Sequence, residues 1–183
     1  MIIMIRIALF FVVAAFILAS CSGGSNEESK TGLLDSIQKM EAELFSSPDL
    51  SLTSDKANRA VLLYSRYVNE FPKDSICPIY LFKSAEMFRA VNNGKMAVEY
   101  YQRIINEYPE CEKVPVSVFL QGFVCENILN DMASAKKYYQ MYLDKYPDGE
   151  FAKDASVLIM NLGKSPEEMI KGFEQQNDTL KAI

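Results

Sequence analysis

Phe71-Pro72-Lys73-Asp74 is the first of three aromatic-proline stretches, and Tyr108-Pro109-Glu110 and Tyr146-Pro147-Asp148-Gly149 follow it. A proline disfavours the helical conformation for the residue before it and has no backbone N–H, so each stretch marks the end of a helix. The three prolines are almost evenly spaced along the chain, and each interval contains two helical patterns with a short polar turn between them. This spacing predicts an array of repeated helix pairs.

The composition limits the classes of function. The chain has 183 residues, of which 49% are hydrophobic and 23% are charged, as expected for one folded domain. Its formal net charge of −5 argues against a nucleic-acid partner, which requires a basic surface. Histidine, the usual general base and the commonest metal ligand, is absent, and the four cysteines are not closely spaced. We therefore expect no cofactor, no metal, no small-molecule substrate and no nucleic acid.

The stretch 1–20 has the order of a secretory signal peptide. Arg6 provides positive charge, an apolar run covers residues 7–19, and small residues precede Cys21. The run is shorter than a membrane-spanning helix requires. Leu18-Ala19-Ser20-Cys21 resembles the bacterial lipobox at all four positions, which implies cleavage before Cys21 and attachment of acyl chains such as palmitate to it. The alternative is an ordinary signal peptide followed by an unmodified cysteine.

The lipobox resemblance also implies where in the cell the protein is located. We expect residues 21–32 to be a flexible polar tether after the lipid-modified cysteine, because they are rich in serine, glycine and glutamate. Ser22 stands where an aspartate would favour retention in the inner membrane, so the expected location is the outer membrane of a bacterial envelope. Whether the protein faces the periplasm or the cell surface is left open.

The folded domain is expected over residues 33–176, with a short tail over 177–183. Apolar residues recur there at steps of three and four, the period of amphipathic helices. Ser165-Pro166-Glu167-Glu168 has the pattern of a capping box, which starts a helix. The predicted helices number about eight: they cover 33–45, 54–71, 95–108 and 150–162, begin near Cys77, near Pro115 and after Asn130-Asp131, and run from Ser165 to about Gln176.

These helix pairs resemble tetratricopeptide repeats. That family places a small residue and an aromatic on the first helix, alanine and an aromatic on the second, and proline at the end. The matching residues are Ala85, Phe88, Ala97, Tyr101 and Pro109 in one pair, and Gly122, Cys125, Ala135, Tyr139 and Pro147 in the next. The resemblance implies an all-α, right-handed solenoid of stacked antiparallel helix pairs. It departs from the family at Cys125, in an opening pair recognisable only by its second helix, and in a last pair without the proline.

The stretch from Tyr146 to Ala152, together with the lipobox, is similar to a group of envelope proteins that includes BamD and the Tol-Pal accessory protein. The likeness implies a scaffold that holds other envelope proteins or peptides and is not an enzyme.

In tetratricopeptide repeats the first helices line a concave groove, which implies a set of partner-binding residues in this chain. Phenylalanines beside charged residues would suit a peptide with apolar anchors. Carried over from the family, the groove residues are Ile79, Phe82, Glu86, Arg89, Val116, Phe119, Phe123, Glu126, Asp154, Val157 and Asn161. The alternative is that the helix over 33–45 covers these residues and makes them part of the core.

Other possibilities also remain at this point. The protein could be a purely structural subunit of a lipoprotein complex, or an enzyme that uses carboxylates such as Glu86, Glu126 and Asp154. No activated nucleophile or phosphate-binding glycine loop supports catalysis. Cys77 and Cys111 precede neighbouring first helices and could form a disulfide, while Cys125 is expected to be a small core residue.

Overall fold

The structure is a computed structural model that describes residues 24–46, 52–165, 167–168 and 170–171. All regular secondary structure in these residues is helical, which confirms the predicted all-α class. The helices are α2 (Gly24–Ser46), α3 (Ser54–Glu70), α4 (Cys77–Ala90), α5 (Gly94–Glu107), α6 (Lys113–Asn127), α7 (Met132–Lys145) and α8 (Ala152–Asn161).

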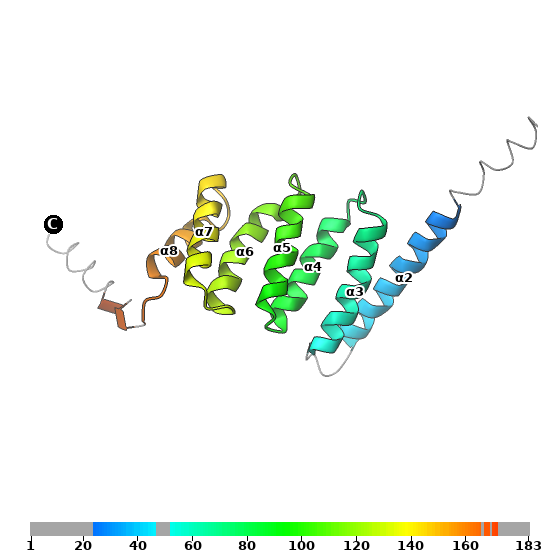
Figure 1. Cartoon of the computed structure of the whole chain (residues 1–183), viewed down its shortest axis with the longest axis horizontal. Coiled ribbons are helices and arrows are strands. Elements are labelled where there is room, and N and C mark those ends of the chain that lie inside the picture. Colours follow the sequence, from blue (N-terminus) through cyan, green and yellow to red (C-terminus); the bar gives the residue numbers. More distant parts are fainter. Residues whose placement is uncertain (1–23, 47–51, 166, 169, 172–183) are drawn as a thin grey trace, which may run out of the picture.

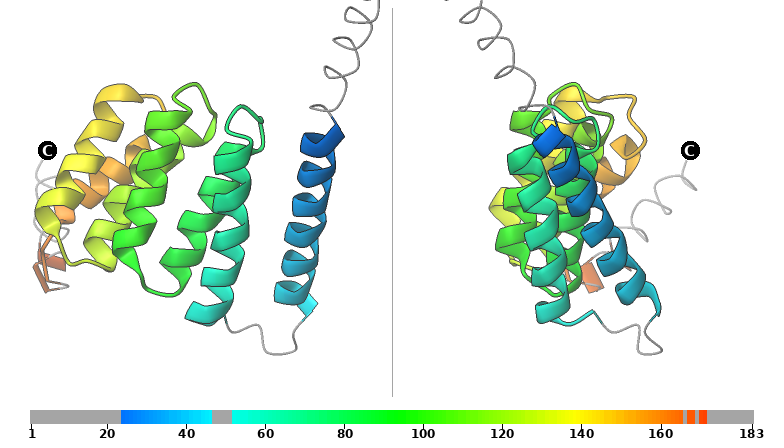
Figure 2. Two further views of the ribbon diagram at one scale, coloured as in Figure 1. Left: turned by 45° about the vertical axis from the view of Figure 1, so that its right-hand side comes forward. Right: turned by 90° about the vertical axis from the view of Figure 1, so that its right-hand side faces the viewer.

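The helices stand side by side in a row, each packed against the next (Figure 1). Helices α2, α4, α6 and α8 are the first members of successive pairs, and α3, α5 and α7 are the second members. The left view of Figure 2 shows the same order, with α2 (blue) at one end and α7 and α8 (yellow and orange) at the other. The arrangement is a helical-repeat solenoid, because each helix buries its apolar side mainly against its neighbours in sequence.

The three aromatic-proline turns have nearly the same backbone. Phe71, Tyr108 and Tyr146 end their helices with φ between −128° and −136° and ψ between 53° and 60°. In each turn the N–H three residues later donates to the carbonyl of that aromatic residue, at 2.9–3.0 Å. The turns are therefore structural repeats as well as sequence repeats.

The core repeats with the same period. Ala60, Ala97 and Ala135 are fully buried at equivalent positions of the three second helices. Four residues later, Tyr64, Tyr101 and Tyr139 are also buried. The small residue permits close approach of the neighbouring helix, and the tyrosine ring fills the space beside it. Helix α3 therefore follows the same plan as α5 and α7.

The first helix differs from the prediction, because α2 begins at Gly24 and not near Leu33. Leu33, Ile37 and Met40 form the buried stripe that was predicted. The residues expected to be a tether continue this helix toward its N-terminus, where Glu27 lies in the first turn and is favoured by the helix dipole. The Lys30 ammonium forms an ion pair with Asp74 at 2.7 Å, which attaches this part of α2 to the first aromatic-proline turn.

The start of α6 and the capping box can also be compared with the sequence prediction. Helix α6 begins at Lys113, two residues before the predicted Pro115. The capping box is confirmed, since the Ser165 N–H donates to Glu168 Oε2 at 2.8 Å and the Glu168 N–H donates to Ser165 Oγ at 3.2 Å. The signal peptide, Cys21, the end of the final helix and the 177–183 tail lie outside the described residues.

Two further findings concern the cysteines and the membrane. Cys77, Cys111 and Cys125 are free thiols, so the structure contains no Cys77–Cys111 disulfide. Cys125 is buried, as expected for a small core residue. Within the described part of the chain, no helix is both long enough and apolar enough to cross a membrane.

Candidate functional site

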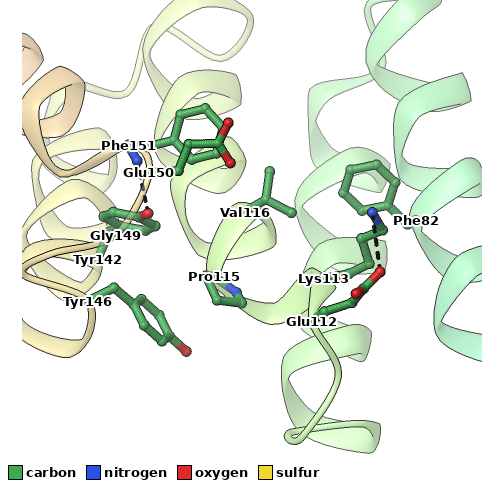
Figure 3. A pocket seen from close by; sticks show the side chains of 10 residues that line it. All are labelled: Phe82, Glu112, Lys113, Pro115, Val116, Tyr142, Tyr146, Gly149, Glu150 and Phe151. Carbon is green, nitrogen blue, oxygen red and sulfur yellow. Dashed lines mark hydrogen bonds and ion pairs between the residues drawn. The ribbon is translucent and has the colours of Figure 1, made fainter.

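The first helices present two clefts that share Phe82. One lies between α4, α6 and the turn before α8 and has a volume of about 520 Å³; we call it the α6–α8 cleft (Figure 3). Its lining is mostly apolar or aromatic, with three charged residues beside it. The apolar and aromatic residues are Phe82, Pro115, Val116, Tyr142, Tyr146 and Phe151, and the charged residues are Glu112, Lys113 and Glu150.

The second cleft lies between α2, α3 and α4 and has a volume of about 430 Å³; we call it the α2–α4 cleft. Apolar side chains again form most of its surface. Its lining residues are Glu41, Leu44, Leu52, Tyr64, Phe82, Lys83, Glu86, Met87, Arg89 and Ala90.

The floor of the α6–α8 cleft is held by aromatic packing. The Phe151 ring stacks on the Phe119 ring with centroids 4.6 Å apart. The Phe151 N–H donates to the Tyr142 hydroxyl at 3.1 Å (Figure 3). Gly149 is needed beside it, because a Cβ at that position would lie 2.5 Å from the Tyr142 hydroxyl oxygen. The turn before α8 therefore places Phe151 in a defined position at the cleft.

On the opposite wall, Phe82 packs edge-on against Tyr101 with centroids 5.8 Å apart. The Lys113 ammonium lies 5.6 Å from the Phe82 ring centroid and 3.8 Å from a carboxylate oxygen of Glu112. The Lys113 ammonium therefore already contacts an aromatic ring and a carboxylate. Val116 projects into the space between the two walls (Figure 3).

Charges at the α2–α4 cleft are also paired with one another. Glu41 accepts hydrogen bonds from Lys83 at 2.6 Å and from the Tyr64 hydroxyl at 2.7 Å. Although burial acts to raise the pKa of Glu41, these two hydrogen bonds lower it overall. Arg89 forms an ion pair with Glu86 at 2.6 Å. Apolar surface therefore remains between charges that already have partners.

A tyrosine-carboxylate hydrogen bond joins the two helices of every complete pair. Tyr64 donates to Glu41, Tyr101 donates to Glu86, and Tyr139 donates to Glu126. Burial, and then the hydrogen bond to the carboxylate, raises the pKa of each of the three hydroxyls. This arrangement gives Glu86 and Glu126 a structural role.

The structure brings some of the predicted groove residues together. Phe82, Glu86, Arg89 and Val116 line the two clefts. Phe119 does not, and its assignment to the groove was wrong. It is only 7% exposed and packs against Tyr139, Tyr142 and Phe151, because α8 and its preceding turn cover it.

The remaining predicted residues line neither cleft. Ile79, Phe123, Glu126 and Asn161 are partly buried, and Asp154 and Val157 are exposed on α8. The alternative in which the first helix covers the groove also differs from the structure. Helix α2 packs against α3, and its residues Glu41 and Leu44 form a wall of the α2–α4 cleft.

Several cleft residues were missed by the sequence reasoning. Lys83, Met87 and Lys113 lie on the predicted first helices, close to residues that were selected. Phe151 was placed at the start of the predicted helix over 150–162 and was not selected as a groove residue. The signal that could have identified it is its position two residues after Gly149, where the turn must direct a side chain back to α6. In the described ranges, no cluster of three or more metal-ligating side chains is present.

The fold and the clefts define an α-helical repeat protein of the solenoid type. A comparison with protein families matches residues 80–110 and 118–149 to the tetratricopeptide repeat. The first match covers most of α4 together with α5 and its turn, and the second covers most of α6 together with α7 and its turn. These two pairs are similar to tetratricopeptide repeats, which generally serve as protein-binding scaffolds. A comparison with curated proteins finds no match.

Proposed function

We propose that this protein is a lipid-anchored scaffold of a bacterial envelope, most simply at the outer membrane, and that it binds protein segments along its first-helix face. The observation that carries the binding proposal is the pair of apolar clefts on either side of Phe82. Apolar clefts bordered by internally paired charges suit an extended or helical segment with apolar anchor residues.

The lipid anchor is proposed at Cys21. Its thiol would lose a proton as the sulfur displaces the headgroup phosphate of a phospholipid: the bond between the glyceryl carbon and the phosphate oxygen breaks, and a diacylglyceryl thioether forms. Hydrolysis of the Ser20–Cys21 peptide bond would then release the amino group for acylation. Two or three acyl chains bind far more firmly than one, since each buried methylene contributes about 0.8 kcal/mol. The resemblance to the BamD and Tol-Pal group supports a role in envelope assembly.

Labelling cells with palmitate tests the anchor. The wild-type protein should incorporate the label, and the Cys21→Ser variant should lose it. A control that keeps Cys21 and changes Cys111→Ser should incorporate label normally. Equal labelling of wild type and Cys21→Ser would end the lipoprotein proposal.

Site-specific photocrosslinking in intact cells tests the binding face. A photoreactive amino acid replaces Val116, which lines the α6–α8 cleft, or Leu62, which is 69% exposed on α3. The proposal expects a discrete adduct from position 116 and none from position 62. Adducts only from position 62 would favour a structural subunit that uses its outer face, and would contradict the groove.

A further inference from the structure

We infer that the repeat domain is held close to the lipid surface by a short connection, with the edge that carries the aromatic-proline turns nearest the membrane. This inference rests on the lipid modification of Cys21 proposed above. The sequence predicted a long flexible tether. Here the domain instead lies beside a lipid bilayer, and the position of the start of α2 determines which edge of the domain faces it.

The first step is the length of chain between the anchor and the folded body. Only Ser22 and Gly23 separate Cys21 from the first residue of α2. An extended chain spans at most about 3.3–3.6 Å per residue, so Cys21 and Gly24 are at most about 11 Å apart. A tether of the expected length, reaching to Leu33, would allow about 40 Å.

The second step is the attachment of α2 to the rest of the domain. Lys30 lies six residues into the helix, about 9 Å from its start at about 1.5 Å per residue. Its ammonium pairs with Asp74 at 2.7 Å and lies 6.0 Å from the Phe71 ring centroid. Asp74 also accepts hydrogen bonds from the Tyr67 hydroxyl at 2.7 Å and from the Ile76 N–H at 3.1 Å. Beyond this point the next apolar residues of the α2 stripe are buried.

The third step is which edge of the solenoid this places near the membrane. Helix α2 begins at the edge where α3, α5 and α7 end, so all three aromatic-proline turns share that edge (Figures 1 and 2). The turns that contain Asn92 and Asn130 lie at the other edge. Helices of 14 to 17 residues separate the two edges by about 21–26 Å.

Charge alone would not produce this orientation. Glu110, Glu112, Asp148 and Glu150 are exposed at the aromatic-proline edge. These carboxylates are repelled by anionic lipids, so the proximity comes from the covalent connection. The proximity of this edge to the membrane should therefore be seen on neutral lipids. It should persist at high salt, where surface charge interactions are screened.

Fluorescence quenching on vesicles tests the inference. The full-length lipidated protein, with the lipid on Cys21 verified by mass spectrometry, is placed on phosphatidylcholine vesicles that contain a headgroup-quencher lipid. A fluorescent amino acid replaces Lys73 at the aromatic-proline edge or Lys95 at the opposite edge, and both lysines are exposed. We expect quenching at position 73 to be several-fold stronger than at position 95.

A linker insertion provides the matched control. A long flexible Gly-Ser segment, inserted between Gly23 and Gly24, should remove most of the difference between the two positions. Equal quenching at both positions in protein that carries the lipid would overturn the inference and leave the proposed anchor intact. Absence of lipid on Cys21 would instead overturn the anchor, and this inference with it.

Discussion

Single residues determine how closely the helices of a pair approach one another. Gly122 of α6 faces Tyr139 of α7, and a Cβ added at Gly122 would lie 2.6 Å from ring atoms of that tyrosine. The ring cannot easily move, because Tyr139 is fully buried and its hydroxyl is bonded to Glu126 at 2.7 Å. The equivalent position in the preceding repeat is Ala85. The α4–α5 pair therefore accommodates a methyl group at this position, whereas the α6–α7 pair has no space for one.

We expect Gly122→Ala to destabilise the domain. Alanine gains about 1 kcal/mol over glycine in helix propensity, but overpacking a core of this kind costs about 1–3 kcal/mol. The steric cost should prevail, giving a lower free energy of unfolding in urea denaturation. The control is Gly32→Ala in α2, where nothing lies within 4 Å of the added Cβ, and which should be neutral or stabilising. Stabilisation by Gly122→Ala would show that the helices can separate without cost.

The tyrosine-carboxylate bonds give a second prediction at this scale. Removing the hydroxyl in Tyr139→Phe leaves Glu126 without its donor, and a hydrogen bond to a charged group contributes about 1.5–3 kcal/mol. Because Glu126 is only partly buried and water can replace the donor, we expect a loss of about 1–2 kcal/mol in chemical denaturation. Tyr80→Phe is the control, since the Tyr80 hydroxyl makes no hydrogen bond within the described residues. Equal effects of the two substitutions would contradict the proposed role of the bond.

Sequence patterns predicted which residues lie on which face of a helix. They did not distinguish residues that line a groove from residues that are buried in the core. Phe82 and Phe119 occupy equivalent positions on two successive first helices. Only Phe119 is covered by Phe151 from the turn before α8, a contact between segments distant in the chain that periodicity does not reveal. Gln121 shows the same limit, because it is fully buried and donates to the Val98 carbonyl of α5 at 3.2 Å.

Among the elements, the first aromatic-proline turn provides the polar contact nearest the start of α2, the ion pair between Lys30 and Asp74. Asp74 accepts hydrogen bonds from Lys30, from the Ile76 N–H and from the Tyr67 hydroxyl, and these lower its pKa from 3.8 to about 2. A carboxyl group whose pKa is lowered by folding stabilises the folded state above its unfolded pKa. That contribution is lost as the pH falls through the folded value.

Asp74→Asn should therefore destabilise the domain in a pH-dependent way. At pH 7 we expect a loss of about 1–2 kcal/mol, from hydrogen bonds to a charged and partly buried acceptor. The difference from wild type should narrow as the pH falls from 3.8 toward about 2, the range in which the wild-type carboxylate takes up its proton. Urea denaturation at a series of pH values measures this difference, and a difference independent of pH would contradict the prediction.

Lys30→Gln is the companion variant for that experiment. The hydrogen bond from Lys30 is the largest cause of the lowered pKa of Asp74, so its removal should raise that pKa. The loss of stability on acidification should then begin near the same unfolded pKa, be complete at a higher pH than in wild type, and amount to less.

The start of α2 shows why element boundaries were harder to predict than element types. The glycines and serines near residue 24 favour a flexible segment by composition. In the folded protein α2 already begins at Gly24, and its Lys30 pairs with Asp74 in a turn that lies beyond the whole of α3. The ends of α3, α5 and α7 were predictable, since a proline determines each one locally.

For the whole molecule, the nearly equal spacing of the three aromatic-proline turns is enough to predict a row of stacked helix pairs. Each pair has only its neighbours to bury its apolar side, so the solenoid follows from local pattern and short connections. The clefts do not follow in the same way, since the α6–α8 cleft combines α4, α6, α7 and the turn before α8. Its shape depends on how successive pairs are inclined to one another.

The central claim is that the first-helix face is an open binding surface and not part of the core. Val116→Glu tests it most directly, because Val116 lines the α6–α8 cleft and is absent from both hydrophobic clusters of the core. The measurement is the yield of the discrete adduct formed by a photoreactive amino acid at Pro115, a second residue of that cleft, in cells that express either wild type or Val116→Glu. We predict that the variant loses the adduct while its midpoint of thermal unfolding stays close to that of wild type. An unchanged adduct, or a loss accompanied by unfolding of the domain, would contradict the claim.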